Sequence, residues 1–457
     1  MPPGSHSTGT LMTPAEIDRS FPAHLSTVRA RTDDALAACG YDAVAIFSGR
    51  PMNHFLDDMG SPFKVNPHFK LWSPLTDAPE SFVCHVPGRR PLLCFYQPAD
   101  YWHRPPQLPG DDWLHEFDVH TIREPAEARE VLMGALGRAP RTAFLGEWHA
   151  EFAEWGFAAA NPPALLSHLH YWRAVKTPYE LQCMRVASRM GARAHVAARD
   201  AFFTGASEFE VHNAYCEASG LTEAELPYQN IIAFNEGAAI LHNHHLGRRR
   251  DGPRRSFLID AGAQCRGYAS DITRTYSGGD PEFAGLIEAM DQVQLELCAA
   301  IRPGQDYREV HLLAHRLIAK LLYDAGVIGC DADTAVESGV SSVFFPHGVG
   351  HLLGLQVHDV AGFAADVTGH EIPKPEGHPY LRLTRRLEPG FVVTVEPGIY
   401  FIEMLLDAAR NAEAGRHIRW DAVERLKPYG GIRIEDDVVC TTGDPENLTR
   451  DAFAALS

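Results

Sequence analysis

Four acidic residues of this 457-residue chain lie in short segments that otherwise have the composition of buried strands or tight turns. They are Asp260 in SFLIDAG, Asp271 in YASDITRTY, Glu396 in VVTVEPG and Glu435 in GGIRIEDD. Burying a carboxylate without a partner is costly, so four of them require positive charge in their midst. Two divalent cations would balance the four charges, which limits the chain to folds that bring all four acids together.

A histidine in a glycine-rich segment is the fifth candidate ligand. His347 and His351 are four residues apart in HGVGH, a spacing that on a helix would suit a zinc pair. The two intervening glycines disfavour a helix, so we expect a loop that presents His351 to the metal. One imidazole among four carboxylates is a hard donor set that favours Mn²⁺, with Co²⁺ or Fe²⁺ as alternatives. Two ions held close together would activate a water molecule.

Simpler explanations exist for each acid. Any one of them taken alone is better explained as a helix cap or a surface residue, and a single Ca²⁺ site is a further alternative. Calcium ligands normally cluster in one loop, whereas these residues are spread from 260 to 435. The occurrence of all five together in apolar or glycine-rich surroundings favours the two-metal interpretation.

The acids fall on two pairs of predicted strands, at 256–261 with 267–276 and at 391–395 with 431–439. Alternation along a strand lets one carboxylate face a cleft while its neighbours stay apolar, and it puts Arg433 and Glu435 on one face. We therefore expect two similar halves that face each other across a shared site.

Length and pattern predict two α/β domains, at 1–172 and 173–457. In the first, strands are predicted at 42–47, 82–86, 91–96 and 142–145, and helices at 13–39 and 125–137. In the second, capping signatures predict helix starts at Thr177, Ser207 and Asp306, and apolar spacing predicts helices over 283–302 and 310–325.

Bulk properties exclude several classes of protein. A net charge of −18 argues against nucleic-acid binding, and the arginines of 248–255 surround an Asp-Gly turn typical of an exposed loop. No apolar run reaches the length of a membrane span, and residues 1–14 lack the features of a secretory signal. The nine cysteines include no Cys-x-x-Cys pair, which favours the cytoplasm over an oxidising compartment.

Longer motifs resemble the bacterial Xaa-Pro dipeptidases (prolidases), the branch that also includes organophosphorus acid anhydrolases. The matching segments are FLDDMGSPFKVNPHFKLW (55–72), DYWH (100–103), PYQNIIAFNE (227–236), SFLIDAGA (256–263), SDITRTY (270–276), FFPHGVGHLLGLQVHDVAGF (344–363), TVEPGIYFIE (394–403) and LKPYGGIRIEDD (426–437). The resemblance implies a smaller N-terminal α/β domain, a C-terminal pita-bread domain and a homodimer.

The resemblance also implies a role for individual residues. Asp271 and Glu435 would bridge two metal ions, Asp260 would complete the shell of one ion, and His351 with Glu396 would complete the other. The residues that match catalytic or substrate-contacting positions are His242, His347, His358 and Arg433, and those that match pocket-lining positions are Tyr228 and Val357. The family commonly has Tyr and Thr after the residue matching His242, whereas this chain has Asn243 and His244, a difference that bears on substrate preference.

Three of these residues have plain alternatives. His358 has the residue type of a satisfied core histidine, and His242 lies in the run HNHH, which also suits a surface tract. Arg433 could pair with Glu435 or Asp436 rather than with a substrate.

The activity implied is hydrolysis of Xaa-Pro dipeptides. Glu396 would carry a proton to the proline nitrogen, His358 would donate to the developing oxyanion, and His242, His347 and Arg433 would contact the substrate carboxylate. The loop 57–72 would cover the partner subunit's site. The alternatives are an organophosphorus acid anhydrolase, an Xaa-Pro aminopeptidase, and a pita-bread binding protein without catalysis.

Overall fold

The computed structural model describes residues 14–137, 139 and 141–456, which divide into two compact units. The first unit contains the described residues up to Leu165 together with Thr177–Cys183, and the second contains Leu166–Lys176 and the described residues from Met184 onward. Helices α4 (Pro163–Arg173) and α5 (Pro178–Phe203) each have residues in both units. The predicted boundary between residues 172 and 173 lies in helix α4, within the part of the chain that is divided between the two units, and it stays a prediction. Residues 1–13 of the N-terminal segment 1–14 lie outside the described residues.

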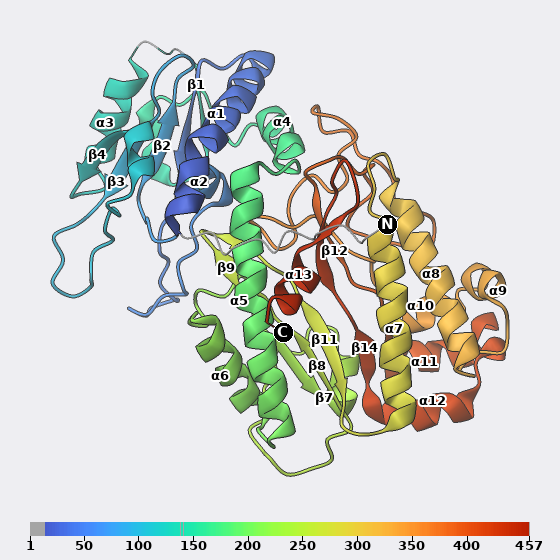
Figure 1. Ribbon diagram of the computed structural model, residues 1–457. Helices are drawn as coiled ribbons and strands as arrows, with labels where there is room; N and C mark the ends of the chain where they lie inside the picture. Colours follow the sequence, from blue (N-terminus) through green and yellow to red (C-terminus); the bar gives the residue numbers. More distant parts are fainter. Residues whose placement is uncertain (1–13, 138, 140, 457) are drawn as a thin grey trace, which may run out of the picture. The chain divides into compact units, whose positions relative to one another are not determined.

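A mixed six-stranded sheet forms the first unit, in the order β4-β3-β2-β1-β5-β6 (Figure 1). Its strands are β1 (Ala43–Phe47), β2 (Phe82–His85), β3 (Leu92–Tyr96), β4 (Asp118–Ile122), β5 (Thr142–Leu145) and β6 (Ala159–Ala160), and its helices are α1 (Pro14–Cys39), α2 (Pro67–Trp72) and α3 (Glu127–Leu136). Alternate residues of β1 pack with α3 in one core, whereas Trp72 of α2 contacts His85 from the opposite face. The four strands predicted here are confirmed, while β4, which is mostly exposed, was not predicted.

The second unit contains two three-stranded sheets, each with helices of its own. One sheet has the order β11-β8-β7 and the other β12-β15-β16. Their strands are β7 (Ile231–Phe234), β8 (Ser256–Asp260), β11 (Thr273–Ser277), β12 (Val392–Val395), β15 (Asp436–Val439) and β16 (Glu446–Asn447). Two short two-stranded antiparallel sheets accompany them, β9 (Gln264–Cys265) with β10 (Tyr268–Ala269) and β13 (Gly398–Tyr400) with β14 (Gly431–Arg433).

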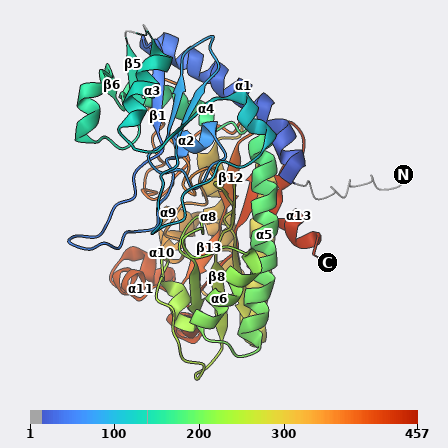
Figure 2. The same ribbon diagram turned by 90° about the vertical axis from the view of Figure 1, so that its left-hand side faces the viewer.

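Helices cover the two sheets from different sides. Helices α5 and α6 (Glu208–Ser219) lie side by side and share a core with β7 and β8 (Figure 1, Figure 2). A larger core joins β12 and β15 to α7 (Pro281–Ala299) and α8 (Tyr307–Asp324). The remaining helices are α9 (Ala332–Glu337), α10 (Val340–Phe344), α11 (Glu403–Arg410), α12 (Trp420–Leu426) and α13 (Leu448–Ala454). Among the described helices, none has the length and apolar character that crossing a membrane requires.

The predicted helix starts are confirmed, with one difference in chemistry. Reciprocal capping boxes join Thr177 to Glu180 and Ser207 to Glu210. Asp306 caps α8 by accepting from the Arg308 amide. Its expected capping-box partner, Glu309, accepts from the Gln305 side chain instead. The arginines of 248–255 lie in an exposed loop, as predicted.

Two predicted strands are interrupted at the acids they carry. The segment 267–276 is broken between β10 and β11, where Asp271 lies, and 431–439 is broken between β14 and β15, where Glu435 lies. An isolated β-bridge between Thr273 and Glu435 connects the two interrupted segments. Each acid therefore lies where regular pairing stops and its side chain can turn toward a common point.

Candidate metal centre

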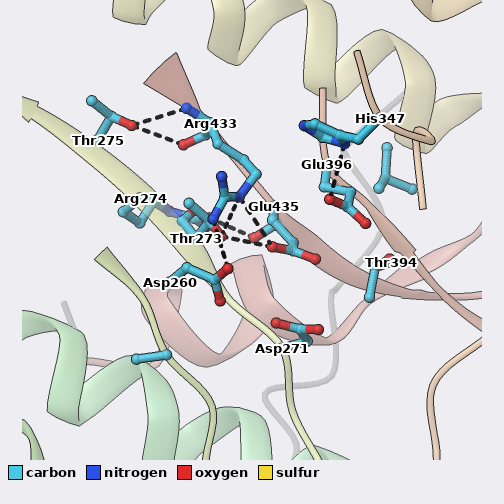
Figure 3. Close-up of polar contacts among 12 residues, drawn as sticks. Asp260, Asp271, Thr273, Arg274, Thr275, His347, Thr394, Glu396, Arg433 and Glu435 are labelled. Carbon is cyan, nitrogen blue, oxygen red and sulfur yellow. Dashed lines mark hydrogen bonds and ion pairs between the residues drawn. The ribbon is translucent and has the colours of Figure 1, made fainter. Parts of the chain in front are cut away.

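The predicted ligands converge at strand ends from both sheets of the second unit (Figure 3). Asp260 ends β8, Asp271 precedes β11, Glu396 follows β12, and Glu435 lies between β14 and β15. His351 comes from the loop after α10. Asp271, His351 and Glu435 are buried, and each offers one ligand atom. These three atoms all lie within 4.8 Å of one another.

The loop that carries His351 is not helical, as the two glycines predicted. A Cβ atom at Gly350 would overlap the Thr394 carbonyl oxygen and the Tyr307 hydroxyl, so this close approach needs glycine. The Tyr307 hydroxyl donates to that carbonyl at 2.7 Å, and the His351 amide donates to Thr394 Oγ1 at 3.1 Å. The loop is thereby fixed to β12, next to Glu396.

The His351 ring presents one nitrogen to the acids. Its Nδ1 lies 3.0 Å from the Leu352 carbonyl oxygen and donates to it, which leaves Nε2 as the nitrogen that faces the acids. Its Nε2 lies 3.5 Å from Asp271 Oδ2 and 3.6 Å from Glu396 Oε1. A backbone contact that fixes the tautomer in this way is typical of metal-binding histidines.

Tyr228 connects two of the carboxylates. Its hydroxyl lies 2.8 Å from Asp260 Oδ1 and 2.6 Å from Asp271 Oδ1, within hydrogen-bonding distance of both. Burial, together with the charges of these two acids, raises the pKa of the Tyr228 hydroxyl, which therefore stays protonated as a donor. The resemblance implied only that Tyr228 lines the pocket, whereas here it also orients two candidate ligands.

Arg433 supplies positive charge at the edge of the cluster (Figure 3). Its Nη2 donates to Asp260 Oδ2 at 2.6 Å, its Nη1 donates to the Tyr400 hydroxyl at 2.8 Å, and its Nε donates to Thr273 Oγ1 at 3.2 Å. Its Nε also lies 3.9 Å from Glu435 Oε2. The sequence left Glu435 and Asp436 as possible partners of Arg433. Glu435 is within ion-pair distance of Arg433, but the shortest ion pair of Arg433 is with Asp260.

His347 lies beside Glu396 and the Tyr400 hydroxyl. Its Nδ1 is 2.8 Å from the Gly348 carbonyl oxygen and 3.5 Å from Glu396 Oε2, and its Nε2 is 2.8 Å from the Tyr400 hydroxyl. Burial, with Arg433 nearby, lowers the pKa of His347 to about 3. The ring is therefore neutral at pH 7.

The other three predicted residues are closer to solvent. The ring of His358 is exposed and packs edge-on against His351, with 4.4 Å between centroids, so His358 is not a core histidine. His242 is exposed and its ring stacks on His244, yet it is near enough to contribute to the lowered pKa of His347 and of His358. Val357 is half-buried in the loop that carries His358.

The cluster holds more negative charge than its own cations balance. Burial raises the pKa of Glu396 to about 7 and that of Glu435 well above its ordinary value, with neighbouring carboxylates adding to both shifts. Burial also raises the pKa of Asp260, whereas at Asp271 contact with His351 overrides burial and lowers the pKa. Four carboxylates that repel one another, next to an imidazole with an available nitrogen, fit divalent cations as the missing positive charge.

Three residues at the site were not singled out in the sequence. Thr273 Oγ1 donates to Glu435 Oε2 at 2.6 Å, Tyr400 joins His347 to Arg433, and an Asp437 oxygen accepts from the Asp271 amide at 3.1 Å. Thr273 and Asp437 each lie two positions after a predicted ligand. The strand period of two could therefore have identified them.

Comparisons with known proteins identify the family to which the chain belongs. Residues 19–171 match the family model for the Xaa-Pro dipeptidase N-terminal domain, and residues 182–442 match metallopeptidase family M24. A Stenotrophomonas maltophilia (strain R551-3) protein named Xaa-Pro dipeptidase is 51% identical over 435 residues, with 95% of this chain and 97% of that protein covered. One of the same name from Xanthomonas campestris pv. campestris (strain 8004) is 52% identical over 445 residues, covering 97% and 100%.

Solved structures show the same fold. The low-pH form of Escherichia coli aminopeptidase P is similar with a TM-score of 0.72 at 23% identity, covering 95% of each chain. The predicted architecture is thereby confirmed, with a smaller N-terminal α/β domain followed by a pita-bread domain. With both family models and near-complete coverage in agreement, this chain belongs to metallopeptidase family M24 and, within it, to the Xaa-Pro dipeptidases.

Proposed function

We propose that this protein hydrolyses Xaa-Pro dipeptides to a free amino acid and proline at a centre of two divalent metal ions. The observation that carries the proposal is the convergence of four acids and one histidine from distant segments, with three of their ligand atoms within 4.8 Å of one another. The relatives named Xaa-Pro dipeptidase, which match almost the whole chain, support the choice of substrate.

The metal ligands in this proposal are Asp260, Asp271, His351, Glu396 and Glu435, with Asp271 and Glu435 shared between the ions. Oxygen-rich ligation favours Mn²⁺, and Co²⁺ or Fe²⁺ would also suit the set. Bound there, the ions would polarise the scissile carbonyl group and lower the pKa of a water molecule.

The remaining side chains would position the dipeptide and move its protons. Glu396, with one oxygen near His351 and the other near His347, would pass a proton to the proline nitrogen so that it can leave. His358, exposed above the His351 ring, would donate to the oxygen that gains charge.

Substrate length would be set at the carboxyl end of the dipeptide. His242, His347 and Arg433 would contact its carboxylate, while Tyr228 and Val357 line the pocket. Arg433 is suited to this role because it carries a fixed charge and already lies against Asp260.

A substrate panel with defined metal content tests the proposal. Protein stripped by a chelator and reloaded with Mn²⁺, Co²⁺ or Fe²⁺ would be assayed on Gly-Pro, on a longer Xaa-Pro peptide and on an organophosphate ester. We expect Mn²⁺-dependent cleavage of Gly-Pro, with the longer peptide poorly cleaved. Preference for the longer peptide would indicate an aminopeptidase, preference for the ester an anhydrolase, and metal-loaded protein inert on every Xaa-Pro dipeptide a binding module.

We also propose that the protein is a cytoplasmic homodimer. The loop before α2 exposes apolar side chains, which mark interaction surfaces when they gather, namely Met52, Phe55, Leu56 and Met59. The segment 57–72 is not a loop throughout, because it ends in helix α2; covering the partner subunit's site with it would make the dimer part of the active enzyme. All nine cysteines are free thiols, which favours a reducing compartment.

A further inference from the structure

Three histidines outside the carboxylate centre form a second cluster of possible metal ligands. His311 and His315 are one turn apart on α8, and His378 comes from the segment between residues 364 and 384. One ring nitrogen from each residue lies within 4.8 Å of those of the other two. The ring centroids are 4.5–4.7 Å apart.

The hydrogen bonds of the three histidine rings indicate which nitrogens could bind a shared metal ion. His311 Nε2 and His378 Nδ1 lie 3.0 Å apart in a hydrogen bond, which a cation bound by both rings would replace. His315 Nδ1 lies 2.9 Å from Ser341 Oγ, so the second nitrogen of that ring, Nε2, is the one that could bind a metal. Metal-binding histidines commonly have this arrangement, in which one nitrogen is held by a polar group and the other is directed at the ion.

Two nitrogens of the cluster are buried without a hydrogen-bond partner among the described residues. They are His311 Nδ1 and His315 Nε2, on side chains that are each 1% exposed. Leaving a buried polar atom without a partner is costly, so two such atoms on neighbouring turns of one helix call for an explanation. A cation that accepts the His315 Nε2 lone pair would supply a partner for that nitrogen.

The protonation state of the cluster suits a cation. Burial, followed by repulsion from the other histidines, lowers the pKa of His311 to about 2 and of His315 to about 3. Both rings are neutral at pH 7, so a metal ion would not have to displace a charge-bearing proton. His378 is only half-buried and would leave a path to solvent for entry and for a fourth ligand.

We propose that His311, His315 and His378 form a transition-metal site, distinct from the carboxylate centre, that takes Zn²⁺ or another imidazole-binding ion. Three neutral imidazoles are a softer donor set than four carboxylates, so the two sites would select different metals. Phe345 contacts the rings of both His315 and His347, at 4.9 and 4.8 Å between centroids. The ion would therefore tie α8 to the 364–384 segment directly behind a residue of the catalytic centre.

Metal counting on matched variants tests this site. His378→Gln removes the half-buried ligand, and His370→Gln, an exposed histidine of the same segment, is the control. Each protein would be equilibrated with Zn²⁺, washed and analysed by elemental mass spectrometry, and its Co²⁺ form would be examined for the visible absorption of a tetrahedral ion. We expect the wild type and His370→Gln to retain one more equivalent per chain than His378→Gln, which would also lose the tetrahedral Co²⁺ band.

A second variant separates metal binding from packing. Ser341→Ala keeps all three rings and removes only the contact to His315 Nδ1, so we expect Zn²⁺ affinity at this site to fall by roughly 10–100-fold. Equal Zn²⁺ content in the wild type, His378→Gln and Ser341→Ala would overturn the proposal. Equal losses in His378→Gln and His370→Gln would show adventitious surface binding only and would overturn it as well.

Discussion

The Thr273 hydroxyl donates a hydrogen bond to Glu435 Oε2 at 2.6 Å, and the backbones of the same two residues pair in an isolated β-bridge. Thr273 is the first residue of β11 and Glu435 directly precedes β15, so this pair joins the two sheets of the second unit. Glu435 is thereby held both by its own strand and by a side chain from the opposite sheet.

Replacing Thr273 by Val should weaken the metal centre without unfolding the protein. The substitution keeps the shape and removes the donor to Glu435, and loss of such a supporting contact lowers metal affinity or activity by roughly 10–100-fold. Titration of metal-free protein with Mn²⁺, followed by Gly-Pro hydrolysis, measures both effects.

Thr384→Val is the matched control, because Thr384 is also buried and donates to the Ile372 carbonyl oxygen instead. Both variants should lose about 1 kcal/mol of stability. Equal Mn²⁺ affinity in the two would contradict the role given to Thr273.

Asp271→Asn should abolish activity while the fold is retained. The side chain keeps its shape but loses the charge that the ligand set needs. Losing the metal's stabilisation of the transition state, several kcal/mol, should lower the rate by roughly 10³-fold or more. Hydrolysis of Gly-Pro and metal content per chain are the measurements, and circular dichroism checks the fold. Substantial hydrolysis by this variant with its full metal content would show that the ligand set is wrongly assigned.

Asp359→Asn should destabilise the second unit. Asp359 is buried between Arg173 and Lys176, and its Oδ2 accepts from Lys176 Nζ at 3.0 Å. Removing the acid leaves two buried cations unpaired, which costs about 3–5 kcal/mol. Denaturant unfolding at pH 7 measures the loss. Asp324→Asn, which removes an exposed ion pair with Lys320, should change stability by less than about 1 kcal/mol.

The stabilities of the wild type and of Asp359→Asn should converge at acid pH. Burial alone would raise the pKa of Asp359, but the charges of Arg173 and Lys176 hold it well below its ordinary value of 3.8. A lowered folded-state pKa contributes stability above the unfolded-state value that is lost as the pH falls toward the folded-state value. The difference between wild type and Asp359→Asn should therefore be constant from pH 7 to about 5 and shrink below about 4. A difference that grows in acid would contradict this assignment.

Phe55→Asp should convert the proposed dimer to monomers. Phe55 is 92% exposed, and a charge placed in an apolar contact opposes association. Analytical ultracentrifugation measures the change, with Met404→Asp on α11, 74% exposed, as the control. A wild-type monomer would refute the dimer, and a Phe55→Asp monomer with undiminished activity would refute the covering role of the segment 57–72.

The sequence predicted the longest helices, the strands beside the acids and the convergence of the five candidate ligands, because both kinds of signal are local. Apolar runs marked β1, β2, β3 and β5, and the capping pairs at Thr177 and Ser207 marked helix starts. The ligands stood out because an acid such as Asp260 is abnormal in an apolar strand.

The parts that were not predicted depend on contacts between distant segments. Thr273 is an unremarkable strand residue until Glu435 lies beside it, and β4 carries too few apolar side chains to signal a strand. The breaks at Asp271 and Glu435 also resist prediction, because the alternating pattern continues through them and only tertiary pairing stops the ladder there. The His311 cluster escaped notice because its third member comes from an irregular segment.

The separation of Thr273 and Glu435 by 162 residues has a consequence during synthesis. A growing polypeptide carries Asp260 and Asp271 long before it carries Glu396, and it completes the set only when β15 is about to emerge. Cation capture at this centre would therefore be a late event in biogenesis, and tight retention of the ions would report that the second unit has been made through to its final strands.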